Sequence, residues 1–164
     1  MSRVAFIYGD ALSRHQLRPD HPMRPVRLRY TYELLQEYGA FDHPDAALLN
    51  PRFATDQELF WLHTARYVAA VKVLGSGSPA GIDPARFGFS DIGDNPVYPG
   101  MFEAASLSTG GSLLAAEMVA NGNVAAAFNI AGGLHHAAAD RASGFCVFNA
   151  VSYTHLTLPT NREV

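Results

Sequence analysis

The sequence of 164 residues contains one cysteine, no long apolar segment and no signal-like start. Cys146 has no second cysteine for an internal disulfide, which agrees with a reducing compartment. The longest apolar stretches, such as residues 124–131, fall short of the roughly 20 residues that span a bilayer. Residues 1–4 lead directly into a strand-like run, without the apolar core and cleavage site of a signal peptide. We therefore expect a cytoplasmic protein with no membrane partner.

Strong charge of either sign is also missing. Twelve basic and fifteen acidic side chains give a net charge of -3, and no run of Lys and Arg is dense enough to follow a phosphate backbone. Nucleic acid is therefore not expected as a direct partner. Hydrophobic residues make up 48% of the chain, enough to bury the core of one domain or of part of one.

The hydrophobic pattern alternates between strands and helices. Apolar runs predict buried strands over residues 3–8 and 124–130, and helical spacing predicts a helix over 26–38. Thr55 and Glu58 have the spacing of a capping box, which predicts a short helix running to about residue 63. The remaining predicted segments are helices over 67–74 and 101–120 and irregular loops over 11–25 and 75–100. Strands that alternate with helices favour an α/β fold with a parallel sheet.

Two adjacent histidines, His135 and His136, follow the second predicted strand after a pair of glycines. Ligand sites in open α/β folds lie at the carboxyl edge of the sheet, where this segment is expected. Histidine titrates near neutral pH, so one of the pair can take a proton from water while the other stabilises an oxyanion or protonates a leaving amine. The pattern alone suits an ordinary loop pair with satisfied hydrogen bonds equally well.

Four blocks of sequence resemble the histone deacetylase family, and they occur in the family's order. They are HPMRPVRLR at residues 21–29, DNPVYPGMFE at 94–103, STGGSL at 108–113, and GGLHHA at 132–137 with ASGFC at 142–146. Among subgroups, the sequence is most similar to the bacterial acetoin-utilisation deacetylases. The resemblance implies a parallel-sheet arginase/deacetylase-like α/β fold that is incomplete in this chain.

The resemblance covers nearly all of residues 1–150 and implies the N-terminal part of a deacetylase domain. After Asn149 the family pattern would place an aspartate, whereas Ala150 opens a tail that does not resemble the family. Residues 151–164 resemble a translated sequencing-library adapter, so we expect a foreign tail. A genuine strand is the alternative, because larger side chains alternate with smaller polar ones in this tail.

An incomplete parallel sheet has a consequence for folding. Such a sheet normally has both faces covered by neighbouring helices. We therefore expect the chain to leave an apolar edge and face exposed, and to aggregate or pack loosely.

The resemblance also implies roles for particular residues. His136 would be the principal general base for metal-bound water, with His135 as its electrostatic partner. Gly144 and Phe145 would line the narrow apolar channel that admits an acetyl-lysine side chain, since an aromatic wall packs well on methylene groups. Cys146 would lie at the inner end of that channel.

Two charged residues complete the implied site. Asp94 would accept hydrogen bonds from the substrate backbone at the rim, and Arg27 would lie beneath the site to hold or guide departing acetate. From the sequence alone, Asp94 also suits a turn and Arg27 a solvated helix face. Phe145 equally suits a core position, and Cys146 a small buried hydrophobe. A rival chemistry would make Cys146 a nucleophile with one of the two histidines as its base.

The residues that hold the metal are expected outside the matched blocks. By resemblance, the metal ligands and the oxyanion-stabilising tyrosine lie downstream of Asn149, so no metal ligand is assigned in this chain. The complete enzyme would use Zn²⁺ or Fe²⁺. We expect a fragment, inactive by itself, of an acetoin-utilisation-type deacetylase that acts on acetylated proteins or small molecules. An acetylpolyamine amidohydrolase fragment and a non-catalytic acetyl-lysine binding module are the alternatives.

Overall fold

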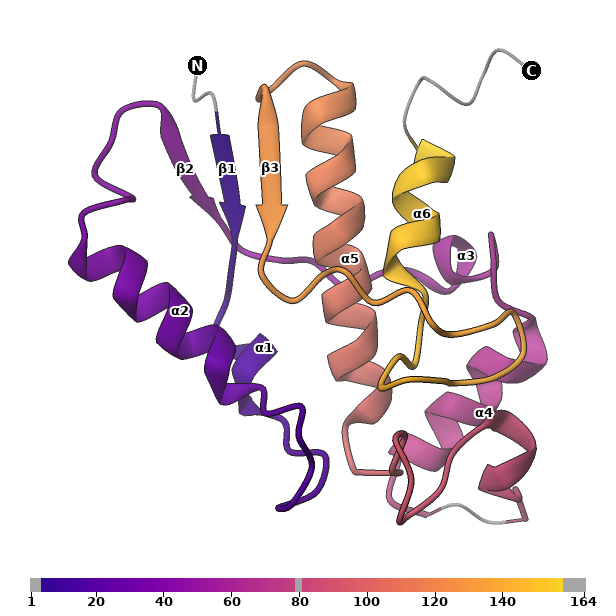
Figure 1. Ribbon diagram of the computed structural model, residues 1–164. Coiled ribbons are helices and arrows are strands. Elements are labelled where there is room, and N and C mark those ends of the chain that lie inside the picture. Colours follow the sequence, from indigo (N-terminus) through magenta and orange to yellow (C-terminus); the bar gives the residue numbers. More distant parts are fainter. Residues whose placement is uncertain (1–3, 79–80, 158–164) are drawn as a thin grey trace.

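The computed structural model describes residues 4–78 and 81–157, and a small parallel sheet lies at its centre (Figure 1). The strands pair in the order β2-β1-β3, with bounds β1 (Val4–Ile7), β2 (Ala46–Leu49) and β3 (Ala126–Asn129). Phe6 of β1 lies opposite Leu48 of β2 and Phe128 of β3, and both pairings are parallel. The predicted α/β class with a parallel sheet is confirmed.

Helices flank the strands. Their bounds are α1 (Ala11–Arg14), α2 (Val26–Glu37), α3 (Asp56–Leu59), α4 (Ala65–Gly75), the 3₁₀ helix η1 (Pro84–Phe87), α5 (Met101–Ala120) and α6 (Ala150–Thr157). Figure 1 shows α2 and α5 to either side of the strands, with α6 beside α5. Within the described segments, no helix has the length and apolar character needed to cross a membrane.

Local sequence signals place most of these elements. The helix predicted from residue 26 is α2, and the capping box is present, since Thr55 Oγ1 accepts a hydrogen bond from Glu58 N while Glu58 Oε2 accepts one from Thr55 N. The strand predicted over 3–8 is β1, with residue 3 outside the described residues. The predicted loop 11–25 contains α1, and the loop 75–100 contains η1.

The sequence interpretation missed β2 altogether. Its four residues, Ala-Ala-Leu-Leu, lack the β-branched and aromatic side chains that predict a strand. This segment is a strand because it pairs in parallel with β1. The short helices α1 and η1 span four residues each, too few to show a helical period.

The segment after Asn149 begins as a helix, so the alternative of a strand there is wrong for the described residues. Asn149 Oδ1 accepts a hydrogen bond from Ser152 N at 3.1 Å near the helix start. Tyr153 is fully buried, and its hydroxyl donates to the Leu59 carbonyl oxygen at 2.9 Å. Residues 158–164 lie outside the described residues, and the foreign origin of the tail stays a prediction.

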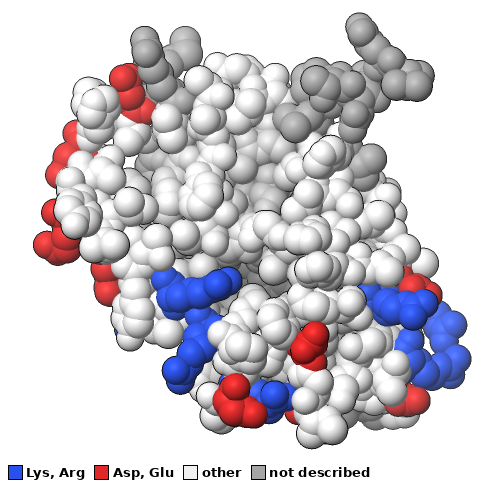
Figure 2. Space-filling view, in the orientation of Figure 1, with Lys and Arg blue, Asp and Glu red and all other residues white. Residues whose placement is uncertain are grey.

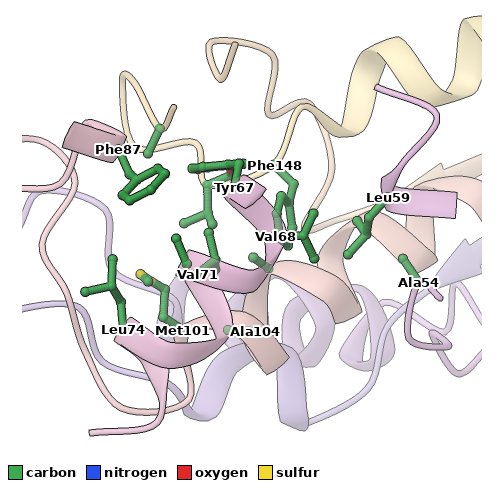
Figure 3. Packing of buried hydrophobic residues seen from close by; sticks show 14 of the residues in the cluster. Ala54, Leu59, Tyr67, Val68, Val71, Leu74, Phe87, Met101, Ala104 and Phe148 are labelled. Atoms are coloured by element: carbon green, nitrogen blue, oxygen red, sulfur yellow. The ribbon is translucent and has the colours of Figure 1, made fainter. Parts of the chain in front are cut away.

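The main hydrophobic core lies between α4, α5 and the segment that follows the two histidines. Figure 3 shows Val71 and Leu74 of α4 close to Met101 and Ala104 of α5. Phe148 belongs to the same cluster and is 1% exposed. The core therefore anchors the chain just beyond the candidate site.

The two faces of the sheet differ in burial. Ala5 and Ile7 are fully buried on the face toward α5. Val4, Leu48 and Phe128 alternate with them in register and are 46%, 42% and 55% exposed. The prediction of a buried second strand is therefore wrong for β3, whose Phe128 side chain is more than half exposed. The expected exposed apolar face is present.

Candidate active site

The two adjacent histidines lie in an exposed segment beyond the C-terminal end of β3. The ring centroids of His135 and His136 are 4.1 Å apart, with 38° between the ring planes. His135 Nδ1 lies 2.9 Å from the Gly133 carbonyl oxygen. Because a carbonyl only accepts, Nδ1 carries the hydrogen and Nε2 of the neutral ring is left to accept a proton. The geometry suits proton transfer at this edge of the sheet.

A sharp turn at Gly144 and Phe145 lies against His136. Both residues have positive φ, 49° and 69°, a conformation that glycine adopts freely and phenylalanine rarely does. A Cβ on Gly144 would lie 2.9 Å from Cγ of His136, so only glycine lets the imidazole lie this close. Asn95 supports the turn, because its Oδ1 accepts from Phe145 N and its Nδ2 donates to the Cys146 carbonyl, each at 3.3 Å. These two bonds hold Phe145 in its strained conformation.

A pocket lies beside this turn. Three of the predicted site residues line it, namely Arg27, Asp94 and Phe145. The rest of the wall is largely apolar and includes Leu12, Leu28, Leu134 and Val147. In the view of Figure 2, basic side chains lie in separate groups on the lower part of the molecule, with acidic ones near them. An apolar lining that also contains the charged side chains of Arg27 and Asp94 suits a ligand with an apolar stem and a polar end.

The other predicted site residues lie next to the pocket rather than in its lining. His136 contacts Gly144, which directly precedes the pocket residue Phe145. Cys146 is 2% exposed, and its Sγ lies 3.4 Å from the Gly144 carbonyl oxygen. The thiol is thus packed beneath the turn. In this conformation it is poorly accessible to a substrate, which disfavours a nucleophilic role.

Sequence reasoning assigned no role to His21, which connects the backbone at Asp94 to Phe145 of the pocket wall. Its Nδ1 accepts a hydrogen bond from Met23 N at 3.1 Å, so Nε2 carries the hydrogen and donates to the Asp94 carbonyl oxygen at 3.0 Å. The ring also meets the Phe145 ring edge-on at 4.8 Å. His21 begins the first of the family-like blocks, which was the available signal.

A second missed residue is His15, which lines the pocket and stacks on Tyr98 with ring centroids 5.8 Å apart. Its Nδ1 is buried and has no hydrogen-bond partner among the described residues. Burial lowers the pKa of His15, because the charged imidazole loses its hydration. The sequence carried no signal for this residue, since it lies in a segment interpreted as an irregular loop.

The described residues do not form a metal site. Residues 4–78 and 81–157 contain no group of three or more His, Cys, Asp or Glu side chains arranged to hold an ion. A catalytic zinc site needs three protein ligands with an open position. The donor set of the described residues therefore does not fit zinc or ferrous iron.

Comparisons with known proteins identify the family. A sequence model of the histone deacetylase domain matches residues 21–163. The acetoin utilization protein AcuC of Bacillus subtilis is 41% identical over 149 residues, which are 91% of this chain and 38% of that protein. AcuC of Staphylococcus aureus strain MSSA476 is 33% identical, over 99% of this chain and 42% of that protein.

Similarity extends to a eukaryotic relative. Histone deacetylase clr6 of Schizosaccharomyces pombe is 32% identical over 95% of this chain and 38% of its own length. The chain thus spans about two-fifths of the length of the curated relatives it matches. Since the domain match covers most of the chain, which has a parallel α/β sheet, this chain belongs to the histone deacetylase family.

Proposed function

We propose that this chain is part of an amidohydrolase that removes acetyl groups from lysine side chains of proteins, as an acetoin-utilisation-type deacetylase. The observation that carries the proposal is the exposed pair His135 and His136, whose tilted rings lie with centroids 4.1 Å apart beside the turn at Gly144 and Phe145. Membership of the histone deacetylase family supports the same chemistry.

Hydrolysis of an amide needs a group that takes a proton from water and a group that returns one to the leaving amine. We assign proton transfer to His136, whose ring lies against Gly144. His135 stabilises the charge that develops on His136, because the two rings are in contact. Its Nδ1 hydrogen bond to the Gly133 carbonyl fixes the ring tautomer for that role.

The pocket supplies binding. Phe145 and the apolar wall pack against the methylene groups of the lysine side chain, which displaces water from the site. The Asp94 carboxylate at the rim accepts hydrogen bonds from the substrate backbone. Arg27 also lines the pocket, and its guanidinium suits the acetate that hydrolysis releases.

The metal-ligand set is proposed to lie outside the described residues, in a longer domain that uses zinc or ferrous iron. In this proposal residues 1–150 are the N-terminal part of that domain, residues 151–164 are a foreign tail, and the chain alone does not hydrolyse the amide. Sequencing the source DNA beyond the Asn149 codon tests this part. A continuing frame that encodes Asp-x-His supports it, and a genuine stop after residue 164 contradicts it.

A chimera tests the activity. Residues 1–149 replace the matched N-terminal part of Bacillus subtilis AcuC, and the purified protein is assayed on acetyl-lysine peptides with and without a chelator. We expect chelator-sensitive release of acetate, reduced about 10²-fold or more by His136→Ala. The exposed residue His43 provides the matched control, and His43→Ala should leave the rate unchanged.

Other outcomes separate the alternatives. Preference for acetylpolyamines over peptides would indicate the small-molecule amidohydrolase. Binding of acetyl-lysine peptide without turnover in the folded, metal-loaded chimera would indicate a binding module. Equal rates for the parent chimera and His136→Ala would contradict the assigned role of the histidine pair.

A further inference from the structure

Two polar side chains outside the pocket, Asn149 and His63, hold the backbone of the histidine segment. Asn149 Nδ2 donates to the carbonyl oxygens of His135 at 3.0 Å and Ala137 at 3.1 Å. Asn149 N donates to His63 Nε2 at 3.1 Å, and His63 Nδ1 lies 3.3 Å from the Ala139 carbonyl oxygen. The two side chains therefore connect this segment to the junction between α3 and α4.

The partners of His63 determine its protonation. A backbone N–H only donates, so Nε2 must accept from Asn149, and the Ala139 carbonyl only accepts, so Nδ1 must carry the hydrogen. His63 is 2% exposed, and its ring centroid lies 5.2 Å from those of Tyr67 and Phe148. Burial lowers the pKa of His63, so the neutral ring that both bonds require is favoured.

Further hydrogen bonds reach the same segment from both sides. Thr64 N donates to the Ala139 carbonyl at 2.9 Å, and Val151 N donates to the Leu134 carbonyl at 3.2 Å. The carbonyls of residues 134, 135, 137 and 139 are thus all bonded to groups outside the segment. The backbone is restrained, while the two catalytic candidates keep exposed side chains.

We propose that His63 and Asn149 are positioning residues of the active site, and that their hydrogen bonds to residues 135–139 set the close ring contact between His135 and His136. This inference rests on the proposed function, in which that pair carries the chemistry. Neither residue reaches the pocket lining, so both act through the backbone. A shift of about 1 Å in a reacting group is enough to cost about 10²-fold in rate. The hydrogen bonds of His63 and Asn149 to residues 135–139, called the clamp below, restrain the backbone against such a shift.

Asn149 allows its two contributions to be separated. Its Oδ1 accepts from Ser152 N at 3.1 Å and supports the start of α6, whereas its Nδ2 makes the bonds to the histidine segment. Asn149→Asp keeps an acceptor for Ser152 but opposes two carbonyl oxygens with a carboxylate oxygen. The variant therefore removes the clamp and retains the support of the helix.

His63 allows a rescue experiment. His63→Phe keeps an aromatic ring among Tyr67 and Phe148 and removes both polar atoms. His63→Gln retains an amide that can accept from Asn149 N and donate to the Ala139 carbonyl. The exposed loop residue His43, changed to Gln, controls for loss of a histidine elsewhere.

The readout is NMR of the imidazole rings in the 164-residue chain, at a temperature below each variant's melting transition. Ring-to-ring NOEs between His135 and His136 report their close contact, and this readout does not depend on enzymatic activity. We expect the NOEs in the parent, His43→Gln and His63→Gln, and their loss in Asn149→Asp and His63→Phe. Global stability alone does not change these NOEs while the protein is folded.

Retention of the NOEs in folded Asn149→Asp or His63→Phe would overturn the positioning role. Should Asn149→Asp fail to fold, Asn149→Ser decides in its place, because it keeps a hydroxyl acceptor for Ser152 and has no amide donor. Loss of the NOEs in His63→Gln as well as His63→Phe would count against the hydrogen bonds as the cause. An inactive chimera with intact NOE results would refute the proposed function and leave the clamp standing.

Discussion

Replacing Gly144 with alanine tests whether the turn after the histidines controls the position of His136. The added Cβ would lie 2.9 Å from Cγ and from Cδ2 of the His136 ring. Ordinary carbon contacts are about 3.5–4.0 Å, so the ring must move by about 0.6 Å or more. These atoms are near the root of the side chain, and the ring has little freedom to escape by rotation.

The magnitude has two parts. The φ of 49° at Gly144 is left-handed, which costs an L-residue about 1–2 kcal/mol. Forcing the His136 side chain away from its preferred rotamer costs about 0.5–1.5 kcal/mol more. We therefore expect Gly144→Ala to lower the free energy of unfolding by about 1.5–3.5 kcal/mol.

Gly133→Ala is the matched control, because Gly133 also has a positive φ, of 82°, and a Cβ there would meet no atom within 4 Å. Gly133→Ala should therefore lower the free energy of unfolding only by the cost of the left-handed backbone, about 1–2 kcal/mol. Urea unfolding followed by circular dichroism measures both variants, and NMR reports the His136 ring signals. The reasoning is refuted if Gly133→Ala shifts the His136 signals as much as Gly144→Ala does.

The remaining predictions concern packing, pH and the open sheet face. Gly110→Ala should lower the free energy of unfolding by about 1–3 kcal/mol, because the added Cβ would overlap backbone atoms of the segment before α3. An unchanged urea midpoint would contradict this prediction. Burial lowers the folded-state pKa of His15 and His63, so the unfolded chain binds more protons than the folded chain as pH falls below about 6.5. The free energy of unfolding should therefore be greatest above that pH and decline below it. Urea midpoints that stay level down to pH 5 would argue against lowered pKa values for these two histidines. The double variant Leu48→Lys, Phe128→Lys should scatter less light and bind less of the dye ANS, because both side chains lie on the exposed apolar face of the sheet. Scattering as strong as that of the parent chain would show that aggregation starts elsewhere.

Features that depend on neighbours in the sequence were predictable from the sequence. The capping box at Thr55 and Glu58 is one, because both partners lie within one helical turn. The helix from residue 26 and the placement of His135 and His136 after a strand are others, since spacing and glycines signal them locally. The matched sequence blocks also predicted the family.

Contacts between distant segments were decided only by the tertiary structure. His21 and Asp94 are 73 residues apart, and His63 and Asn149 are 86 apart, so no local pattern signals either contact. The strand β2 exists through its pairing with β1 and not through its propensity. The sequence by itself therefore determined the family and most of the local elements, and it predicted which residues carry the chemistry. The tertiary structure decided which backbone groups hold those residues in place, because hydrogen bonds and burial depend on proximity in space and not in the chain.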